Sequence, residues 1–302
     1  MSGRKQLTER DERLLSMLAR CGALSVDQAG AVYGVASYHK ARISELAKRD
    51  YIARADNLIQ ITARGAKAIG LDQVPFRVRH KWQRQHKADV AGILLSLQGW
   101  DAAFPHEVKR SNSYVYRGAR FDAVVSKNGR EYALYLLSSR PQQQAVRTIR
   151  KELAHLKSWR IRHAIVFYPS PEALEKFGVE PANLESLLLL PYPFGVGLLE
   201  SLDIIDERVR KLFPGCQPCA RPFADYELDG VFITSLVTND LVKRRALRDY
   251  LDYVAAREAR KNVIVCLASQ KGAFAALFPN TEIVTVPDAL VSEVFPACVS
   301  QS

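Results

Sequence analysis

The sequence contains no long hydrophobic run. Its longest charge-free apolar stretch, residues 186–199, is interrupted by Pro191 and Pro193. This stretch is shorter than the roughly 20 residues that cross a bilayer. The polar and charged residues 1–10 also lack the apolar segment of a secretory signal. These absences predict a cytoplasmic protein without a membrane partner.

Cysteine, glycine and proline are also scarce. The 302 residues include 16 glycines, 14 prolines and five cysteines, while 48% are hydrophobic and 25% are charged. This composition excludes collagen, low-complexity and disordered classes and allows two or three globular domains. An odd number of scattered cysteines suits a reducing compartment better than a disulfide framework.

Familiar enzyme motifs are missing as well. The sequence contains no phosphate-binding P-loop, no GxSxG serine motif and no dinucleotide fingerprint. Cys216 and Cys219 form a lone CxxC without a second pair of ligands, so a zinc or redox role is the weaker interpretation. His80 and His86 are six residues apart on a predicted helix and do not share a face. We therefore expect no catalytic residue, no metal site and no cofactor.

Positive charge is abundant and unevenly distributed. The chain has 43 basic and 32 acidic residues, a formal net charge of +11. Residues 1–160 carry a net charge of +15, whereas residues 161–302 carry −4. A basic front half favours a polyanionic partner, most commonly nucleic acid.

The first 70 residues contain a sequence of short helices followed by a hairpin. Capping boxes at Thr8 and Ser25 begin two helices, and a third begins at Ser37. Two short β-type runs, residues 51–54 and 58–61, flank a turn, and a short helix follows. This order predicts a winged helix-turn-helix domain over residues 5–70.

The remaining chain alternates helices with strands. After a long basic helix over residues 77–98, we expect strands at 102–108, 119–125, 132–137 and 163–168, with a helix at 142–159 before the last of these. Further helices and strands continue to residue 286. The predicted fold class is therefore α/β, with a mixed-sheet, nuclease-like region and a C-terminal extension over residues 77–302.

The third helix is the candidate DNA-reading element. If Ile43, Leu46 and Ala47 face the core, Arg42 points outward and reaches a guanine edge in the major groove. Neighbouring cations on this helix, the hairpin and the long basic helix would contact phosphates. The candidate DNA-binding residues are Ser37, Tyr38, Lys40, Arg42, Lys48, Arg49, Arg54, Asn57, Arg79, Lys81 and Arg84.

A nuclease site is only partly represented in the sequence. Restriction-type nucleases hold Mg²⁺ with an Asp on one strand and a Glu-x-Lys on the next. Asp122 stands at the first of these positions, and Glu107 precedes it on a predicted strand. On the following strand Glu131 lies at the wrong end, and Ala133 occupies the place of the lysine. We therefore expect a nuclease-shaped region without catalytic activity.

Several short segments within residues 7–157 resemble the replication-relaxation family of plasmid and mobile-element proteins. The resemblance implies a winged helix joined to a restriction-endonuclease-like domain, with double-stranded DNA bound at an origin, transfer site or promoter. The segments are Leu7-Thr8-Glu9-Arg10-Asp11, Leu24-Ser25-Val26-Asp27-Gln28, Arg42-Ile43, Ile61-Thr62-Ala63-Arg64-Gly65 and Phe121-Asp122.

These observations predict a sequence-preferring duplex DNA-binding protein that acts in replication, transfer or transcription of a mobile element. The acidic back half would bind a protein partner or a second copy, because a dimer doubles the DNA read by one winged helix. Two alternatives remain open: an active Mg²⁺-dependent nuclease, and a protein-interaction scaffold that does not contact DNA.

Overall fold

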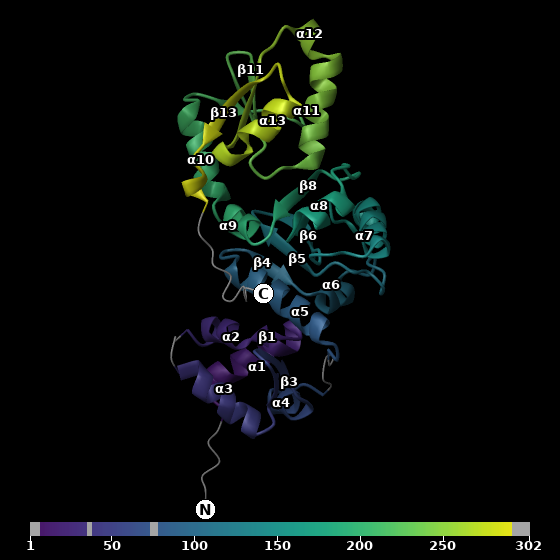
Figure 1. Cartoon of the computed structure of the whole chain (residues 1–302), viewed down its shortest axis with the longest axis vertical. Coiled ribbons are helices and arrows are strands. Elements are labelled where there is room, and N and C mark those ends of the chain that lie inside the picture. Colours follow the sequence, from purple (N-terminus) through teal and green to yellow (C-terminus); the bar gives the residue numbers. More distant parts are fainter. Residues whose placement is uncertain (1–6, 35–37, 73–77, 292–302) are drawn as a thin grey trace, which may run out of the picture. The chain divides into compact units, whose positions relative to one another are not determined.

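The chain folds into two compact units. The computed structural model describes residues 7–34, 38–72 and 78–291 (Figure 1). Among these residues, one unit ends at residue 98 and the other comprises residues 99–291. Both units combine helices with sheets, and the sheets of the second unit are mixed, which confirms the predicted α/β class.

Four helices lie within residues 7–72, and three of them begin at capping residues that the structure describes. These are α1 (Glu9–Cys21), α2 (Val26–Tyr33), α3 (Tyr38–Lys48) and α4 (Ala63–Ala68). The predicted capping boxes are present at Thr8 and Ser25, and Thr62 caps α4 through its side chain. The apolar stripe of α1, with Leu14, Leu15 and Leu18, is fully buried in the core.

A small antiparallel sheet completes the arrangement of these helices. Its strand order is β1–β3–β2, formed by β1 (Leu24–Ser25), β2 (Ile52–Ala55) and β3 (Leu58–Ile61). Asp56 at the turn between β2 and β3 has a φ of 56°, a left-handed conformation that Asp tolerates better than most residues. The predicted hairpin is therefore confirmed, with Ile52 paired to Ile61.

The long basic helix belongs to the first unit, which corrects the predicted boundary at residues 70–77. This helix, α5 (Lys81–Ser96), buries Ala88, Val90 and Ile93. The side-chain amide of Gln28 on α2 donates to the carbonyl of Ala88 over 2.8 Å. A Cβ added at Gly92 would lie 2.6 Å from the same amide nitrogen, so the two helices meet closely.

The second unit contains two five-stranded mixed sheets. The first has the order β4–β5–β6–β7–β8, with β4, β5 and β6 antiparallel and β6, β7 and β8 parallel. Its strands are β4 (Asp101–Ala103), β5 (Ala123–Lys127), β6 (Arg130–Leu136), β7 (His163–Tyr168) and β8 (Ser186–Pro191). Three helices, α6 (Pro105–Ser111), α7 (Gln143–His155) and α8 (Pro171–Phe177), occur between them, and the 3₁₀ turn η1 (Leu156–Trp159) follows α7.

The second sheet has the order β13–β12–β11–β10–β9, with β11, β12 and β13 parallel. Its strands are β9 (Gln217–Pro218), β10 (Tyr226–Leu228), β11 (Val231–Ser235), β12 (Asn262–Leu267) and β13 (Glu282–Val286). The helices that follow β8 in the chain are α9 (Phe194–Glu200), α10 (Leu202–Leu212), α11 (Leu241–Tyr253), α12 (Ala255–Glu258) and α13 (Lys271–Leu277). All six residues of β12 are buried, and the continuous apolar run at 263–267 agrees with a central strand covered on both faces.

One predicted strand is mainly helix. We expected a strand over residues 102–108, but β4 ends at Ala103 and α6 begins at Pro105. Proline is favoured in the first helical turn, and the Glu107 carboxylate accepts from the Phe104 amide over 2.8 Å. Glu107 thus lies on a helix rather than on the strand where a nuclease acid was considered.

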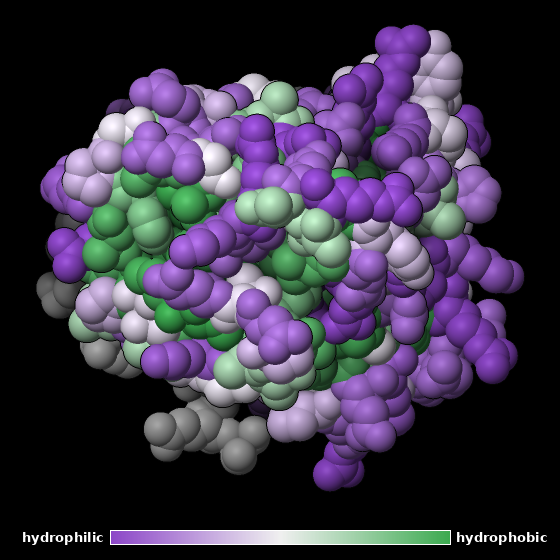
Figure 2. Space-filling model, turned by 90° about the horizontal axis from the view of Figure 1, so that it is seen from above, coloured by the Kyte–Doolittle hydropathy of each residue, from purple (hydrophilic) through white to green (hydrophobic). Residues whose placement is uncertain are grey.

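Polar side chains cover much of the face shown in Figure 2, and hydrophobic residues reach the surface between them. The most exposed large apolar side chains of the described residues include Trp82, Tyr114, Tyr116 and Tyr253. In residues 7–34, 38–72 and 78–291, no helix combines the length and hydrophobicity needed to cross a membrane.

Candidate nucleic-acid interface

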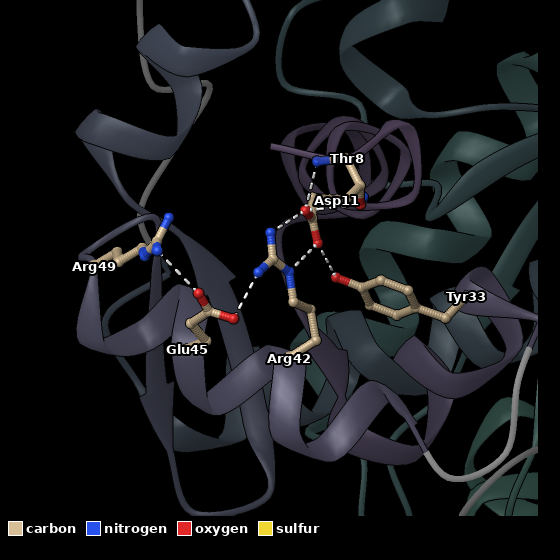
Figure 3. A network of polar contacts seen from close by, with 6 residues as sticks. All are labelled: Thr8, Asp11, Tyr33, Arg42, Glu45 and Arg49. Carbon is tan, nitrogen blue, oxygen red and sulfur yellow. Dashed lines mark hydrogen bonds and ion pairs between the residues drawn. The ribbon is translucent and has the colours of Figure 1, made fainter. Parts of the chain in front are cut away.

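A buried ion pair between α1 and α3 sets the orientation of α3 (Figure 3). Arg42 donates from Nε to Oδ1 of Asp11 over 2.9 Å and from Nη2 to Oδ2 over 2.5 Å. The Tyr33 hydroxyl and the amide and hydroxyl of Thr8 donate to the same carboxylate. The side chains of Arg42 and Asp11 are 4% and 0% exposed. The carboxylate is therefore well satisfied, as a buried charge requires.

The contacts continue along α3 to two further charged residues. Arg42 donates from Nη1 to Glu45 over 2.6 Å, and Glu45 also pairs with Arg49 at 3.0 Å. Burial disfavours the charged form of Asp11, but hydrogen bonds from Arg42, Thr8 and Tyr33 outweigh burial and lower its pKa to about 2. The hydrogen bond to Asp11 raises the pKa of Arg42.

This lowered pKa predicts an acid-dependent loss of stability. Asp11 titrates at about 2 in the folded chain and near 3.8 when unperturbed, so its contribution is complete above about pH 4 and declines as the pH falls toward 2. Across that window we expect the wild type to lose about 2 kcal/mol of unfolding free energy that Asp11→Asn does not lose. Urea denaturation followed by circular dichroism at several pH values measures the difference. Identical pH slopes for both proteins would contradict this expectation.

The burial of Arg42 corrects the prediction that it reads a base edge. The outward face of α3 carries Lys40, Ala41 and Lys48, with Ser44 partly exposed, whereas His39, Arg42, Ile43 and Leu46 face inward. Arg49 is 31% exposed and pairs with Glu45. Ser37 and the side chain of Tyr38 lie outside the described residues. Lys40 and Lys48 therefore remain as candidate phosphate contacts on this helix.

The hairpin and the start of α5 lie side by side. Lys81 at the first turn of α5 is 3.3 Å from the carboxylate of Asp56 at the β2–β3 turn. Arg54 on β2 donates to the Asp56 carbonyl over 3.2 Å, and Arg54 and Asn57 are exposed. Two groups of predicted DNA-binding residues, distant in sequence, thus share one surface.

Two aromatic residues beside this surface were not among the predicted site residues. The rings of His80 and Trp82 are stacked with centroids 6.5 Å apart, and the Trp82 side chain is 69% exposed. Arg84 donates to the carbonyl of Arg79 over 3.2 Å, and Arg79 is exposed. The alternation of aromatic and basic residues at 79–84 was the available sequence signal.

Two buried acids of the second unit, Asp122 and Glu152, accept hydrogen bonds from backbone amides. Asp122, which is 7% exposed, accepts from the Leu136 amide over 2.9 Å. Glu152 on α7, which sequence reasoning missed, accepts from the Arg120 amide at 2.8 and 3.0 Å and from the Tyr135 hydroxyl at 3.3 Å. Burial raises the pKa of Glu152. These hydrogen bonds link the segment just before β5 to β6 and to α7.

The CxxC cysteines flank β9 and are partly exposed. Cys266 is buried in the core of the second sheet, and burial raises its pKa to about 11. Cys298 lies outside the described residues. Within the described part of the chain, no three His, Cys, Asp or Glu side chains are grouped closely enough to hold a metal ion.

Comparisons of the chain with protein-family models, with curated proteins and with solved structures give no match.

Proposed function

We propose that this chain is a sequence-preferring, duplex DNA-binding protein that uses α3 and the β2–β3 hairpin as a winged helix-turn-helix. Three helices followed by a hairpin are typical of that DNA-binding architecture. From the resemblance of its segments to the replication-relaxation family, we further propose that it acts in the cytoplasm, in replication, transfer or transcription of a plasmid or other mobile element. The second unit would bind a protein partner or a second copy.

The exposed charge of α3 is the observation that carries this proposal. Its carboxylate, Glu45, is held by Arg42 and Arg49, while Lys40 and Lys48 are exposed. Lys40 is 3.9 Å from Asp27, a weak surface pair that a phosphate could replace. Positive charge on the outward face of a helix favours the phosphates that border the major groove.

Because Arg42 is buried, we assign base contacts to smaller side chains on the outward face of α3. Ala41 and Ser44 lie on the outward face of α3 between the two lysines. A serine hydroxyl hydrogen-bonds to several base edges, and alanine contacts the thymine methyl group. We therefore propose modest sequence preference through these two residues in place of Arg42.

The burial and backbone hydrogen bonds of Asp122 favour a structural role for the nuclease-like region. An Mg²⁺ site requires carboxylate oxygens directed toward a shared position. Oδ2 of Asp122 instead accepts from β6, and both oxygens of Glu152 accept from the Arg120 amide. We propose that this unit does not cut DNA.

Salt-dependent binding by two lysine variants tests the duplex interface. In fluorescence anisotropy with a labelled duplex, we expect wild-type affinity to fall linearly with salt on logarithmic axes, with a slope of about 0.9 for each phosphate contacted. Lys40→Gln and Lys48→Gln should each lower that slope by about 0.9. The cause is the loss of one counterion-releasing contact in each variant.

Lys261→Gln is the matched control, because Lys261 is an exposed lysine of the second unit. It should leave the slope unchanged. Absence of wild-type duplex binding at low salt would reject the proposed function in favour of a protein scaffold. In a parallel plasmid assay, EDTA-sensitive nicking that Asp122→Ala abolishes would establish the nuclease alternative.

A further inference from the structure

An anchored loop in the second unit presents two exposed tyrosines. Residues 112–120 form most of the connection between α6 and β5, and Val115 and Ala119 bury their side chains in the core. The Asn112 side chain donates to the Trp159 carbonyl over 2.8 Å. At the other end of the loop, the Arg120 amide donates to Glu152. Hydrogen bonds near both ends and two buried side chains between them therefore restrain the backbone that carries the exposed tyrosines.

Trp159 and Arg160 contact the two exposed rings of this loop. Tyr114 and Tyr116 are 54% and 51% exposed, although buried Trp159 lies 5.8 Å from the Tyr116 ring. The guanidinium carbon of Arg160 is 4.4 Å from the centroid of Tyr114, and its Nη2 donates to the tyrosine hydroxyl over 2.8 Å. These contacts restrict both rings while leaving about half of each side chain open to solvent.

Arg160 has an unusual backbone conformation. Its φ is 65°, in the left-handed region where glycine or asparagine is favoured. An arginine at this position ends η1 and places its side chain against Tyr114.

The surface around the rings is strongly positive. Residues 108–120 contain four basic and no acidic residues, and the acid just before them, Glu107, is partly exposed and accepts from the Phe104 amide. In α7 and η1 the only acid is Glu152, which is 4% exposed and faces the loop backbone. Arg110 and Arg117 are exposed. The exposed charge of this surface is therefore positive.

We propose that this loop, together with the α7–η1 turn, forms a second nucleic-acid site that binds a single strand. Phosphates would contact Arg110, Arg117 and Arg160, and unpaired bases would stack on Tyr114 and Tyr116. Single-strand sites combine cations with aromatic platforms, because every base has a face that stacks. A duplex hides those faces, so it would use only the charges. This site is separate from the duplex interface proposed on the first unit and does not depend on it.

Tyrosine and arginine substitutions in the full chain separate stacking from charge. The probes are a labelled thymidine oligonucleotide of about sixteen nucleotides, the matching uridine oligonucleotide and a labelled duplex. The double variant Tyr114→Ala/Tyr116→Ala should bind both single strands about tenfold or more weakly at every salt concentration, since each stacked base is lost. Arg117→Gln should lower the single-strand salt slope by about 0.7, because one phosphate contact is lost. Affinity for the duplex should change by less than about twofold in the tyrosine variant, because duplex bases do not stack on the rings.

Tyr253→Ala and Arg257→Gln are the matched controls, because each removes an exposed residue of the same type from the α11–α12 region. Both should bind single strands as the wild type does.

Thermal melting must show that the tyrosine variant is folded, and Tyr114→Phe/Tyr116→Phe should retain binding because its rings remain. Equal losses on duplex and single strands, or no loss on either, would overturn the site. A difference between the thymidine and uridine probes would identify DNA or RNA as its ligand. Failure of duplex binding alone would reject only the interface on the first unit.

Discussion

Replacing Arg42 with alanine is expected to destabilise the first unit by about 3–5 kcal/mol, because the substitution leaves a buried carboxylate without its cation. Asp11 is fully buried and accepts two hydrogen bonds from Arg42. Its remaining donors, Thr8 and Tyr33, do not neutralise its charge. Urea denaturation measures the loss, and hydrogen exchange of peptides from α1 and α3 locates it in the first unit.

A double-mutant cycle isolates the ion pair. Asp11→Ala/Arg42→Ala should cost less than the sum of the two single substitutions, because no uncompensated charge remains buried. Lys48→Ala, on the exposed face of α3, should change stability by less than about 0.5 kcal/mol. A loss for Arg42→Ala no larger than for Lys48→Ala would show that the pair does not stabilise the fold. Where Arg42→Ala is partly unfolded, we expect equal loss of binding to preferred and random DNA.

Replacing Gly65 with alanine is expected to destabilise the first unit by about 3 kcal/mol or more, because the new methyl group overlaps the backbone. A Cβ at Gly65 would lie 2.0 Å from the carbonyl oxygen of Tyr51 and 3.0 Å from the Ile61 side chain. That carbonyl already accepts from the Thr62 amide over 3.1 Å. Removing this steric overlap would therefore require α4 to move away from the base of the hairpin. Thermal and urea denaturation measure the effect.

Gly272→Ala is the control for this experiment. Gly272 lies in the first turn of α13, and a Cβ there would meet no atom within 4 Å. In a helix with free space, alanine should be neutral or stabilising by up to about 1 kcal/mol. A similar small effect for both substitutions would show that α4 accommodates the added methyl group without loss.

Short-range features were predictable because their interactions lie within a few residues. The capping boxes at Thr8 and Ser25 join residues three apart. The turn at Asp56 requires only a local left-handed conformation, and the strand at residues 163–168 is a short apolar run. Local periodicity and capping chemistry determine such elements.

The orientation of α3 depended on a partner distant in sequence. The apolar residues Ile43 and Leu46 define a core face only approximately, and Arg42 lies at its margin. Arg42 turned inward because Asp11, 31 residues earlier in the chain, provides a buried counter-charge. A hydrophobicity pattern treats arginine as a surface residue and therefore misses this pair.

The sequence did not determine which unit α5 packs against, because that choice also depends on residues distant in the chain. Its buried residues Ala88, Val90 and Ile93 predict packing, but they do not specify which core receives them. The close approach of Gly92 and the hydrogen bond from Gln28 to Ala88 attach it to the first unit. With α5 packed on the first unit, Lys81 at its start pairs with Asp56 of the hairpin turn. This contact brings the basic residues of α5 beside the hairpin.

The sequence by itself determined the α/β class, the positions of most helices and strands and the excess of positive charge before residue 160. These properties follow from composition and from interactions over a few residues. Only the tertiary structure decided which charges remain exposed: it buried Arg42 against Asp11 and left Lys40 and Lys48 in solvent. It also brought Tyr114 against Arg160, 46 residues later in the chain. Burial and pairing between distant residues depend on the packing of whole elements, so no local pattern specifies them.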